Sequence, residues 1–255
     1  MTDSSFPAEK GKRLFVCGAT SAIALPVCRR LAADSASFFL VARNAQRLDR
    51  VAADLSTRGA ARVETRCLDL TKTARHSDLV SEAFATFGEF DIAFLAHGIL
   101  GDPSRVVEDP KEAEKVLQTN FTSAVSLLTL LANRFEKQRR GTIAVITSVA
   151  GDRGRKSNYV YGSAKAGLTV FLQGLRHRLH SAGVRVVAIK PGFILTPMTE
   201  NLARKPLAVE PKQIAPDILR SFESGPEEVY TPWFWKPIMT AIRWIPEPLF
   251  KRLDL

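Results

Sequence analysis

The sequence predicts an α/β fold, in which a doubly wound, mostly parallel sheet carries helices on both faces. Short apolar runs alternate with longer segments of helical periodicity, and a glycine turn follows the first apolar run. Strands that alternate with helices pair in parallel through right-handed crossovers. The chain has 255 residues and neither an internal repeat nor a low-complexity linker, so we expect a single domain.

The predicted strands are the short apolar runs. They cover Arg13–Cys17, Ser37–Ala42, Arg62–Leu68, Phe90–Ala96, Thr142–Ser148 and Val184–Ile189, with a final strand around Val229 and Tyr230. Helical periodicity predicts helices over Ile23–Ala33, Gln46–Thr57, Leu79–Phe87, Lys111–Gln138 and Val160–Ala182. The stretch 198–228 carries hinge-capable prolines, Pro206 and Pro211 among them, and few strand signals, which permits a small substrate lid there. An apolar and basic tail follows over 230–255.

A glycine opens the connection between the first strand and the first helix. The segment Gly18-Ala-Thr-Ser-Ala-Ile-Ala24 has the strand–turn–helix context of a Rossmann-type dinucleotide site, where helix N–H groups face a pyrophosphate. Ala22 and Ala24 stand where this motif usually has its second and third glycines, and their methyl groups narrow the approach to the backbone. Thr20 and Ser21 can donate hydroxyl hydrogen bonds, so dinucleotide binding is still predicted.

The end of the second strand favours a phosphorylated dinucleotide. Ala42-Arg43-Asn44 lacks the acidic residue that holds the ribose hydroxyls in NAD sites. Arg43 could pair with a 2′-phosphate, so NADPH is the expected cofactor. NADH stays the alternative, because Arg43 could equally begin a solvated helix.

A tyrosine and a lysine lie four positions apart on the helix predicted from Val160. Tyr161 and Lys165 therefore share one helix face, where the ammonium would lower the pKa of the phenol toward the working range. Such a phenol can give its proton to a carbonyl oxygen. Ser148 ends the fifth predicted strand, and its hydroxyl could bond the same oxygen.

Together these motifs resemble the short-chain dehydrogenase/reductase family over nearly the whole chain. Gly18–Ala24, Asp69, Asn120, Ser148, Tyr161, Lys165 and Pro191-Gly-x-x-x-Thr196 follow the order and spacing of that family. The resemblance implies a catalytic tetrad of Asn120, Ser148, Tyr161 and Lys165. It also implies cofactor contacts from Gly18, Thr20, Ser21, Ile23, Arg43, Asp69, Leu70, Ala96, Gly98, Tyr161, Lys165, Pro191, Gly192, Ile194 and Thr196. It further implies NAD(P)-dependent ketone chemistry, and a homodimer or homotetramer that forms through helices 111–138 and 160–182.

Three cations lie between Ser148 and Tyr161, namely Arg153, Arg155 and Lys156. Guanidinium groups suit phosphate oxygens, so these residues are predicted to grip an anionic substrate group, with a solvated loop as the alternative. Segments 151–162 and 245–253 resemble the decaprenylphosphoryl-2-keto-β-D-erythro-pentose reductases. That resemblance implies a keto-sugar on a polyprenyl phosphate, in the step from a 2-keto-pentose to arabinose. A general carbonyl or hydroxysteroid-like dehydrogenase and a non-catalytic nucleotide-binding protein are the alternatives.

The net charge of +10 is spread along the chain without a nucleic-acid-binding motif, so no nucleic-acid partner is expected. The tail 230–255 combines tryptophans with lysines and arginines, which suits peripheral contact with a membrane surface. Packing of the tail on a dimer mate or on the lid of its own chain is the alternative. The three cysteines show no metal-ligand spacing, so no metal site is expected. Without an apolar segment near residue 1 or a long apolar run, we expect a cytoplasmic protein, with or without membrane association.

Overall fold

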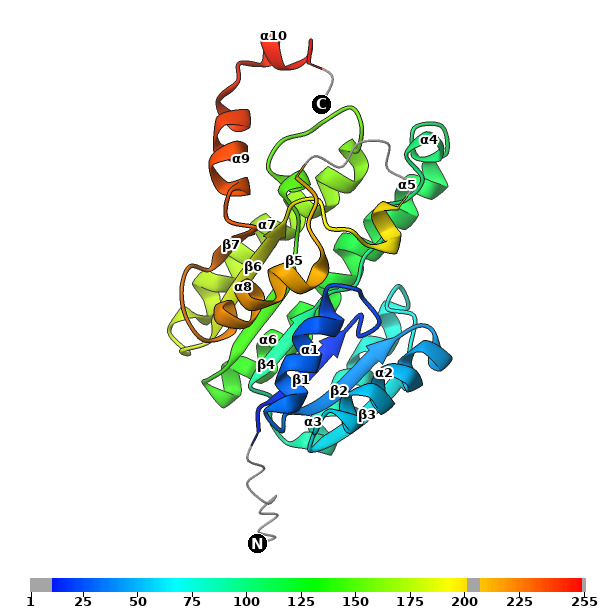
Figure 1. Cartoon of the computed structure of the whole chain (residues 1–255), viewed down its shortest axis with the longest axis vertical. Coiled ribbons are helices and arrows are strands. Elements are labelled where there is room, and N and C mark those ends of the chain that lie inside the picture. The colour runs from blue at the N-terminus through cyan, green and yellow to red at the C-terminus, as the bar shows by residue number, and fades with distance from the viewer. Residues whose placement is uncertain (1–10, 201–206, 254–255) are drawn as a thin grey trace, which may run out of the picture.

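A single parallel sheet of seven strands forms the centre of the molecule in the computed structural model, which describes residues 11–200 and 207–253 (Figure 1). The strands are β1 Arg13–Cys17, β2 Ser37–Ala42, β3 Arg62–Cys67, β4 Ile92–Leu95, β5 Thr142–Ile146, β6 Arg185–Pro191 and β7 Glu228–Thr231. Their order in the sheet is β3-β2-β1-β4-β5-β6-β7. The winding reverses between β1 and β4, so a crevice for a ligand is expected at the carboxyl ends of these two strands. The predicted fold class is confirmed.

Helices cover both faces of the sheet. Helices α1 Ala24–Ala33, α2 Ala45–Thr57 and α8 Pro211–Glu223 pack on one face, and α3 His76–Phe87, α6 Ser123–Gln138 and α7 Tyr159–His180 pack on the other. Successive strand residues alternate between the two cores. Leu14 and Val16 of β1 join the α1 side, whereas Phe15 and Cys17 join the α6 side, as a strand buried on both faces requires.

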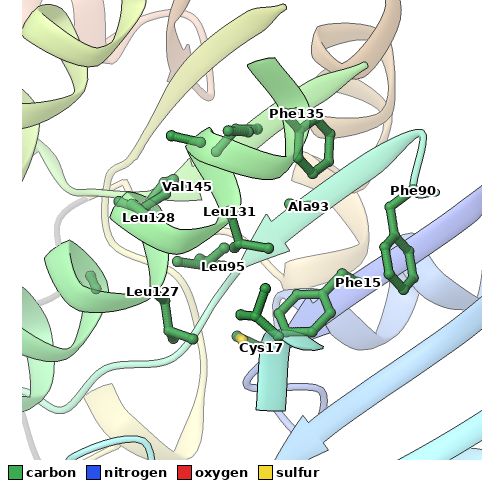
Figure 2. Close-up of a cluster of buried hydrophobic side chains, with 14 of the residues drawn as sticks. Phe15, Cys17, Phe90, Ala93, Leu95, Leu127, Leu128, Leu131, Phe135 and Val145 are labelled. Atoms are coloured by element: carbon green, nitrogen blue, oxygen red, sulfur yellow. The ribbon is translucent and has the colours of Figure 1, made fainter. Parts of the chain in front are cut away.

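An aromatic cluster fills the α6 side of the sheet (Figure 2). Phe15 stacks on Phe39 with 5.7 Å between ring centroids, and Phe90 meets Phe15 edge-on at the same distance. Leu127, Leu131 and other apolar residues of α6 belong to the same buried cluster (Figure 2). Burial of these side chains supplies the main free energy that holds α6 against the sheet.

The predicted helix Lys111–Gln138 is interrupted. The chain forms α5 Pro110–Leu117, a π-helical turn over Gln118–Thr122, and then α6; the short helix α4 Pro103–Val106 precedes them. Asn120 lies inside the π-helical turn. Such turns are common at functional sites, because they reorient the side chains that follow.

Part of the stretch predicted as a lid belongs to the core. Helix α8 buries Ile214, Ile218 and Phe222 against the sheet, so the prediction of a lid over 198–228 is wrong for 211–223. Pro211 occupies the first helical turn, and Glu210 and Gln213 form a capping box. Proline fits that position well, so what looked like a hinge residue is the start of a helix. Residues 201–206 of the predicted lid lie outside the described part of the chain.

The C-terminal segment forms two further helices, α9 Trp235–Trp244 and α10 Glu247–Phe250, which extend beyond the carboxyl end of β7 (Figure 1). Among the described helices, none is both long enough and apolar enough to cross a membrane.

Candidate active site

The residues predicted from motifs gather at one edge of the sheet. Gly18 follows β1, Arg43 follows β2, Asp69 follows β3, Gly98 follows β4 and Ser148 follows β5. Because all the strands are parallel, these connections all leave the same edge, on both sides of the reversal in strand order.

The turn after β1 is tightly held. Gly18 has a φ of +77°, and a Cβ there would lie 2.6 Å from the His97 nitrogen, so only glycine fits. Its N–H and that of Ala19 donate to the Val41 carbonyl at 2.8 and 3.1 Å. Neither Ala22 nor Ala24 has a positive φ, and Ala24 is fully buried on the α1 side of the sheet. The two alanines are therefore compatible with this turn.

The beginning of α1 suits a dinucleotide phosphate. The Ile23 N–H bonds the Ser21 hydroxyl oxygen at 3.3 Å, and no side chain caps the helix at Ile23. Unpaired N–H groups in a first helical turn carry partial positive charge and bind pyrophosphate oxygens. Thr20 is half-buried and lies in the turn between β1 and α1. Gly18, Thr20, Ser21 and Ile23 thus fit the pyrophosphate of NAD(P).

Asp69 and Arg43 lie at the outer end of the crevice. Asp69 Oδ1 accepts hydrogen bonds from the Thr71 N–H at 3.0 Å and the Thr71 hydroxyl at 2.9 Å. The Thr71 backbone bond outweighs the effect of burial and lowers the pKa of Asp69, with help from the charge of Arg43. The Arg43 side chain is exposed. Leu70 is buried, and its carbonyl accepts from the His76 ring at 3.0 Å.

Ser148, Tyr161 and Lys165 come together at the carboxyl end of β5. Ser148 caps a short 3-10 turn over Val149–Gly151. That turn packs so closely on α7 that a Cβ at Gly151 would lie 2.7 Å from the Ala166 nitrogen. This packing places the Ser148 hydroxyl within hydrogen-bonding reach of the Tyr161 phenol.

The pKa of Tyr161 beside Lys165 differs from the expectation. Burial raises the pKa of Tyr161 to about 12, against a weaker lowering by the hydrogen bond with Ser148. The predicted lowering of this pKa by Lys165 is wrong for this structure, because desolvation of the phenolate dominates. Lys165 is 2% exposed, its Nζ donates to the Ile146 carbonyl at 3.0 Å, and burial lowers its pKa to about 8. At neutral pH the site therefore holds a protonated phenol beside an ammonium group.

Asn120 fastens the loop after β4. Its Nδ2 donates to the carbonyls of Ile99 and Val116, each at 2.8 Å, and its Oδ1 accepts from the Ile99 N–H at 3.2 Å. A Cβ at Gly98 would lie 2.6 Å from Asn120 Oδ1 and 3.6 Å from Lys165 Nζ. The side chains of Asn120 and Lys165 thus both lie next to Gly98. Ala96, the other residue predicted from this loop, is buried beside it.

The segment after β6 forms the far wall of the crevice. Pro191 ends β6 and pairs with Thr231, and Ile194 forms an isolated parallel bridge with Val209. Thr196 caps a 3-10 turn over Pro197–Thr199. Gly192 leaves no room for a side chain, because a Cβ there would lie 1.8 Å from Trp235 Nε1.

The three cations of the loop have different surroundings. Arg153 donates to the Arg243 carbonyl at 3.0 Å and to the Glu247 carboxylate at 2.6 Å, so its prediction as a substrate ligand is corrected: it binds the C-terminal segment. The pairing could not be predicted from the sequence, because Arg153 and Glu247 are 94 positions apart in the chain. Arg155 has a buried Nε without a hydrogen-bond partner among the described residues.

A small hollow that is open to solvent lies beside Tyr161. Its wall is mostly apolar, and the one cation in it is Lys156 among the described residues. The lining residues are Leu100, Pro103, Val106, Val107, Lys156, Ser157, Asn158, Tyr159, Val160 and Tyr161.

Comparison with known proteins shows the family of the chain. The family model of the short chain dehydrogenases matches residues 12–207. An uncharacterized oxidoreductase of Mycobacterium tuberculosis is 41% identical over 238 residues, which cover 93% of this chain and 95% of the relative. The chain belongs to the short-chain dehydrogenase family.

Other short-chain dehydrogenases are similar in sequence or in fold. An uncharacterized oxidoreductase of Streptomyces coelicolor is 38% identical over 243 residues, 95% of this chain and 96% of the relative. The structure of a short chain dehydrogenase from Burkholderia cenocepacia in complex with NADP has a TM-score of 0.80 at 20% identity and covers 96% of this chain and 98% of its own. The latter likeness concerns the fold. This short-chain dehydrogenase is an NAD(P)-dependent oxidoreductase.

One polar cluster of this short-chain dehydrogenase was not predicted. Lys190 on β6 donates to Asp152 Oδ1 at 2.9 Å and to Glu228 Oε2 at 3.1 Å, and the Tyr230 hydroxyl donates to Asp152 Oδ2 at 2.8 Å. Burial opposes the charge of Lys190, but Asp152 and Glu228 outweigh it and raise its pKa. A lysine directly after the apolar run Val186–Ile189 was the available sign, because a buried cation requires a carboxylate. The cluster fastens the loop that follows Ser148 to β6 and β7.

Proposed function

We propose that this dehydrogenase reduces a ketone with NADPH, and that the ketone is a keto-sugar carried on a polyprenyl phosphate. The observation that carries the proposal is the grouping of Ser148, Tyr161 and Lys165 next to an apolar hollow that contains Lys156. The apolar wall suits a hydrocarbon chain, and a cation suits a phosphate. The partly buried Arg155 is a second candidate for the phosphate.

The residues divide the chemistry as follows. Bound NADPH supplies the hydride for the carbonyl carbon. Tyr161 gives its phenolic proton to the carbonyl oxygen, and Ser148 donates a hydrogen bond to that oxygen as its charge grows. The Lys165 ammonium stabilises the phenolate that remains. Asn120 supports Lys165 by holding Gly98 beside it.

The cofactor preference follows from the end of β2. Arg43 is exposed at the carboxyl end of β2, its charge helps to lower the pKa of Asp69, and a guanidinium at that position suits a ribose 2′-phosphate. Gly192, Ile194 and Thr196 would line the nicotinamide side. NADH remains the competing cofactor.

An unphosphorylated lipophilic ketone is the second candidate, because most of the hollow is apolar. A 3-oxoacyl-[acyl-carrier-protein] reductase of Chlamydia muridarum is 29% identical over 192 residues, which also favours carbonyl reduction of this kind. The exposed Trp233 and Trp244, beside Lys236 and Arg243, suit contact of the tail with a membrane surface that would present a lipid-linked substrate.

The test compares reduction of a polyprenyl-phosphate keto-sugar with that of a lipophilic ketone, each with NADPH and with NADH. We expect the phosphorylated substrate and NADPH to give the highest kcat/KM. Tyr161→Phe removes the proton but keeps the ring, so turnover should fall about 10²-fold or more. Titration of tryptophan fluorescence with NADPH is the control for intact cofactor binding. Full activity of Tyr161→Phe would contradict the mechanism, and equal rates on both ketones would favour the second candidate.

A further inference from the structure

The C-terminal segment packs directly on the loops that carry the active site. Trp235 and Met239 of α9 are buried against Val149, the neighbour of Ser148, and Phe193 packs on the same cluster. The indole of Trp235 also fills the space beside Gly192. One face of α9 is thus part of the wall behind Ser148.

Arg153 binds the end of this segment with three separate contacts. Its Nη1 donates to the Arg243 carbonyl at 3.0 Å, and its Nη2 donates to Glu247 Oε2 at 2.6 Å. Its guanidinium carbon lies 4.3 Å from the centre of the Phe250 ring, and Phe250 is buried. The Arg153 side chain is only 18% exposed, whereas Glu247 is 74% exposed, so the guanidinium is mostly shielded from solvent and the carboxylate end of the ion pair is open to it.

The residue before Arg153 is held from the other direction. Asp152 bonds Lys190 and Tyr230, both of which belong to the sheet. The loop between Ser148 and Tyr161 is therefore fixed on one side to β6 and β7 and on the other side to α9 and α10. Removal of either attachment should increase the mobility of a loop that begins at a catalytic hydroxyl.

We propose that Arg153 is a positioning residue, which couples the C-terminal segment to the loop after Ser148 and so holds that hydroxyl in its reactive position. For its kinetic consequence the proposal rests on the proposed reductase function. Small displacements of a reacting group cost large factors in rate, so the coupling should appear in kcat rather than in cofactor affinity.

Arg153→Ala and Glu247→Gln test the two ends of the contact. Glu247 is 74% exposed, so its amide variant should fold normally. Hydrogen–deuterium exchange of the full-length protein is expected to rise in residues 235–250 and also in residues 149–158 for both variants. For Arg153→Ala, kcat on the ketone should fall about tenfold, while the Kd for NADPH stays within about twofold.

Three comparisons make the test specific. Arg153→Lys keeps the charge and should restore part of kcat, which a purely structural loss would not show. The double variant should be no worse than Arg153→Ala, because Arg153→Ala already removes the contact that Glu247→Gln weakens. Thr240→Ala changes an exposed side chain of α9 whose hydroxyl donates to the Lys236 carbonyl within the same helix, and it should behave as wild type.

Faster exchange in the tail without any change in residues 149–158 would overturn the proposal, as would additive effects in the double variant. A wild-type protein that reduces no ketone, but whose loop exchange responds to Glu247→Gln, would refute the proposed function and leave the coupling supported. An active wild type whose loop does not respond would refute the coupling alone.

Discussion

Burial acts on Tyr161 and Lys165 in opposite senses. It raises the pKa of the phenol to about 12 and lowers the pKa of the lysine to about 8. Below pH 8 both groups therefore carry their protons. This state suits reduction, in which the phenol must donate a proton and the ammonium must stabilise the phenolate left behind.

The pH profile of reduction follows from these two values. The folded-state pKa of Lys165 is lowered, so its charge is lost as the pH rises past about 8, well before the phenol ionises. We expect kcat to be level below that pH and to fall roughly tenfold per pH unit above it. Steady-state rates measured across the neutral and alkaline range check this. A level profile up to the ionisation of the phenol would contradict the role of Lys165.

At the scale of elements, α8 shows how a motif-poor stretch can still be structural. Its apolar positions Ile214, Ile218 and Phe222 recur at helical spacing and are buried. The prolines in this stretch suggested hinges of a lid, although proline also fits the first turn of a helix, where Pro211 lies. A helix with this buried face packs on the part of the sheet from β5 to β7 and does not act as a lid over the substrate.

Ile218→Ala measures that contribution. The side chain is fully buried, so its truncation should lower the free energy of unfolding by about 2–5 kcal/mol in urea denaturation. Arg220→Ala, on the exposed face of α8, should change it by about 0.5 kcal/mol or less. Equal effects of the two variants would show that α8 does not belong to the core.

At the scale of the whole molecule, the outer face of α6 and α7 carries a hollow lined by Thr129, Val170, Phe171, Gly174, Leu175 and Arg178. Val170 is 65% exposed. These are the helices through which the family resemblance implies a dimer or tetramer. Exposed apolar side chains on such a face suit contact with a second copy of the chain.

Val170→Glu should therefore shift the protein toward the monomer, because a carboxylate in an apolar interface loses its hydration. Light scattering coupled to size-exclusion chromatography gives the mass. Val107→Glu is the matched control, since Val107 is 55% exposed, directly follows α4 and does not line this hollow. An unchanged mass for Val170→Glu would place the interface elsewhere.

The sequence alone determined the strands, the parallel sheet, and the grouping of Gly18, Ser148, Tyr161 and Lys165 near one sheet edge. Strands and helices can be read from hydrophobic periodicity, which is a local property of the sequence. Once the strands are parallel, the loops after them all leave the same edge of the sheet. Only the tertiary structure decided that Arg153 binds Glu247, that Lys190 binds Asp152, and that burial outweighs Lys165 in setting the pKa of Tyr161. Each of these depends on segments that are distant in the chain, and on how far their packing removes a charge from water.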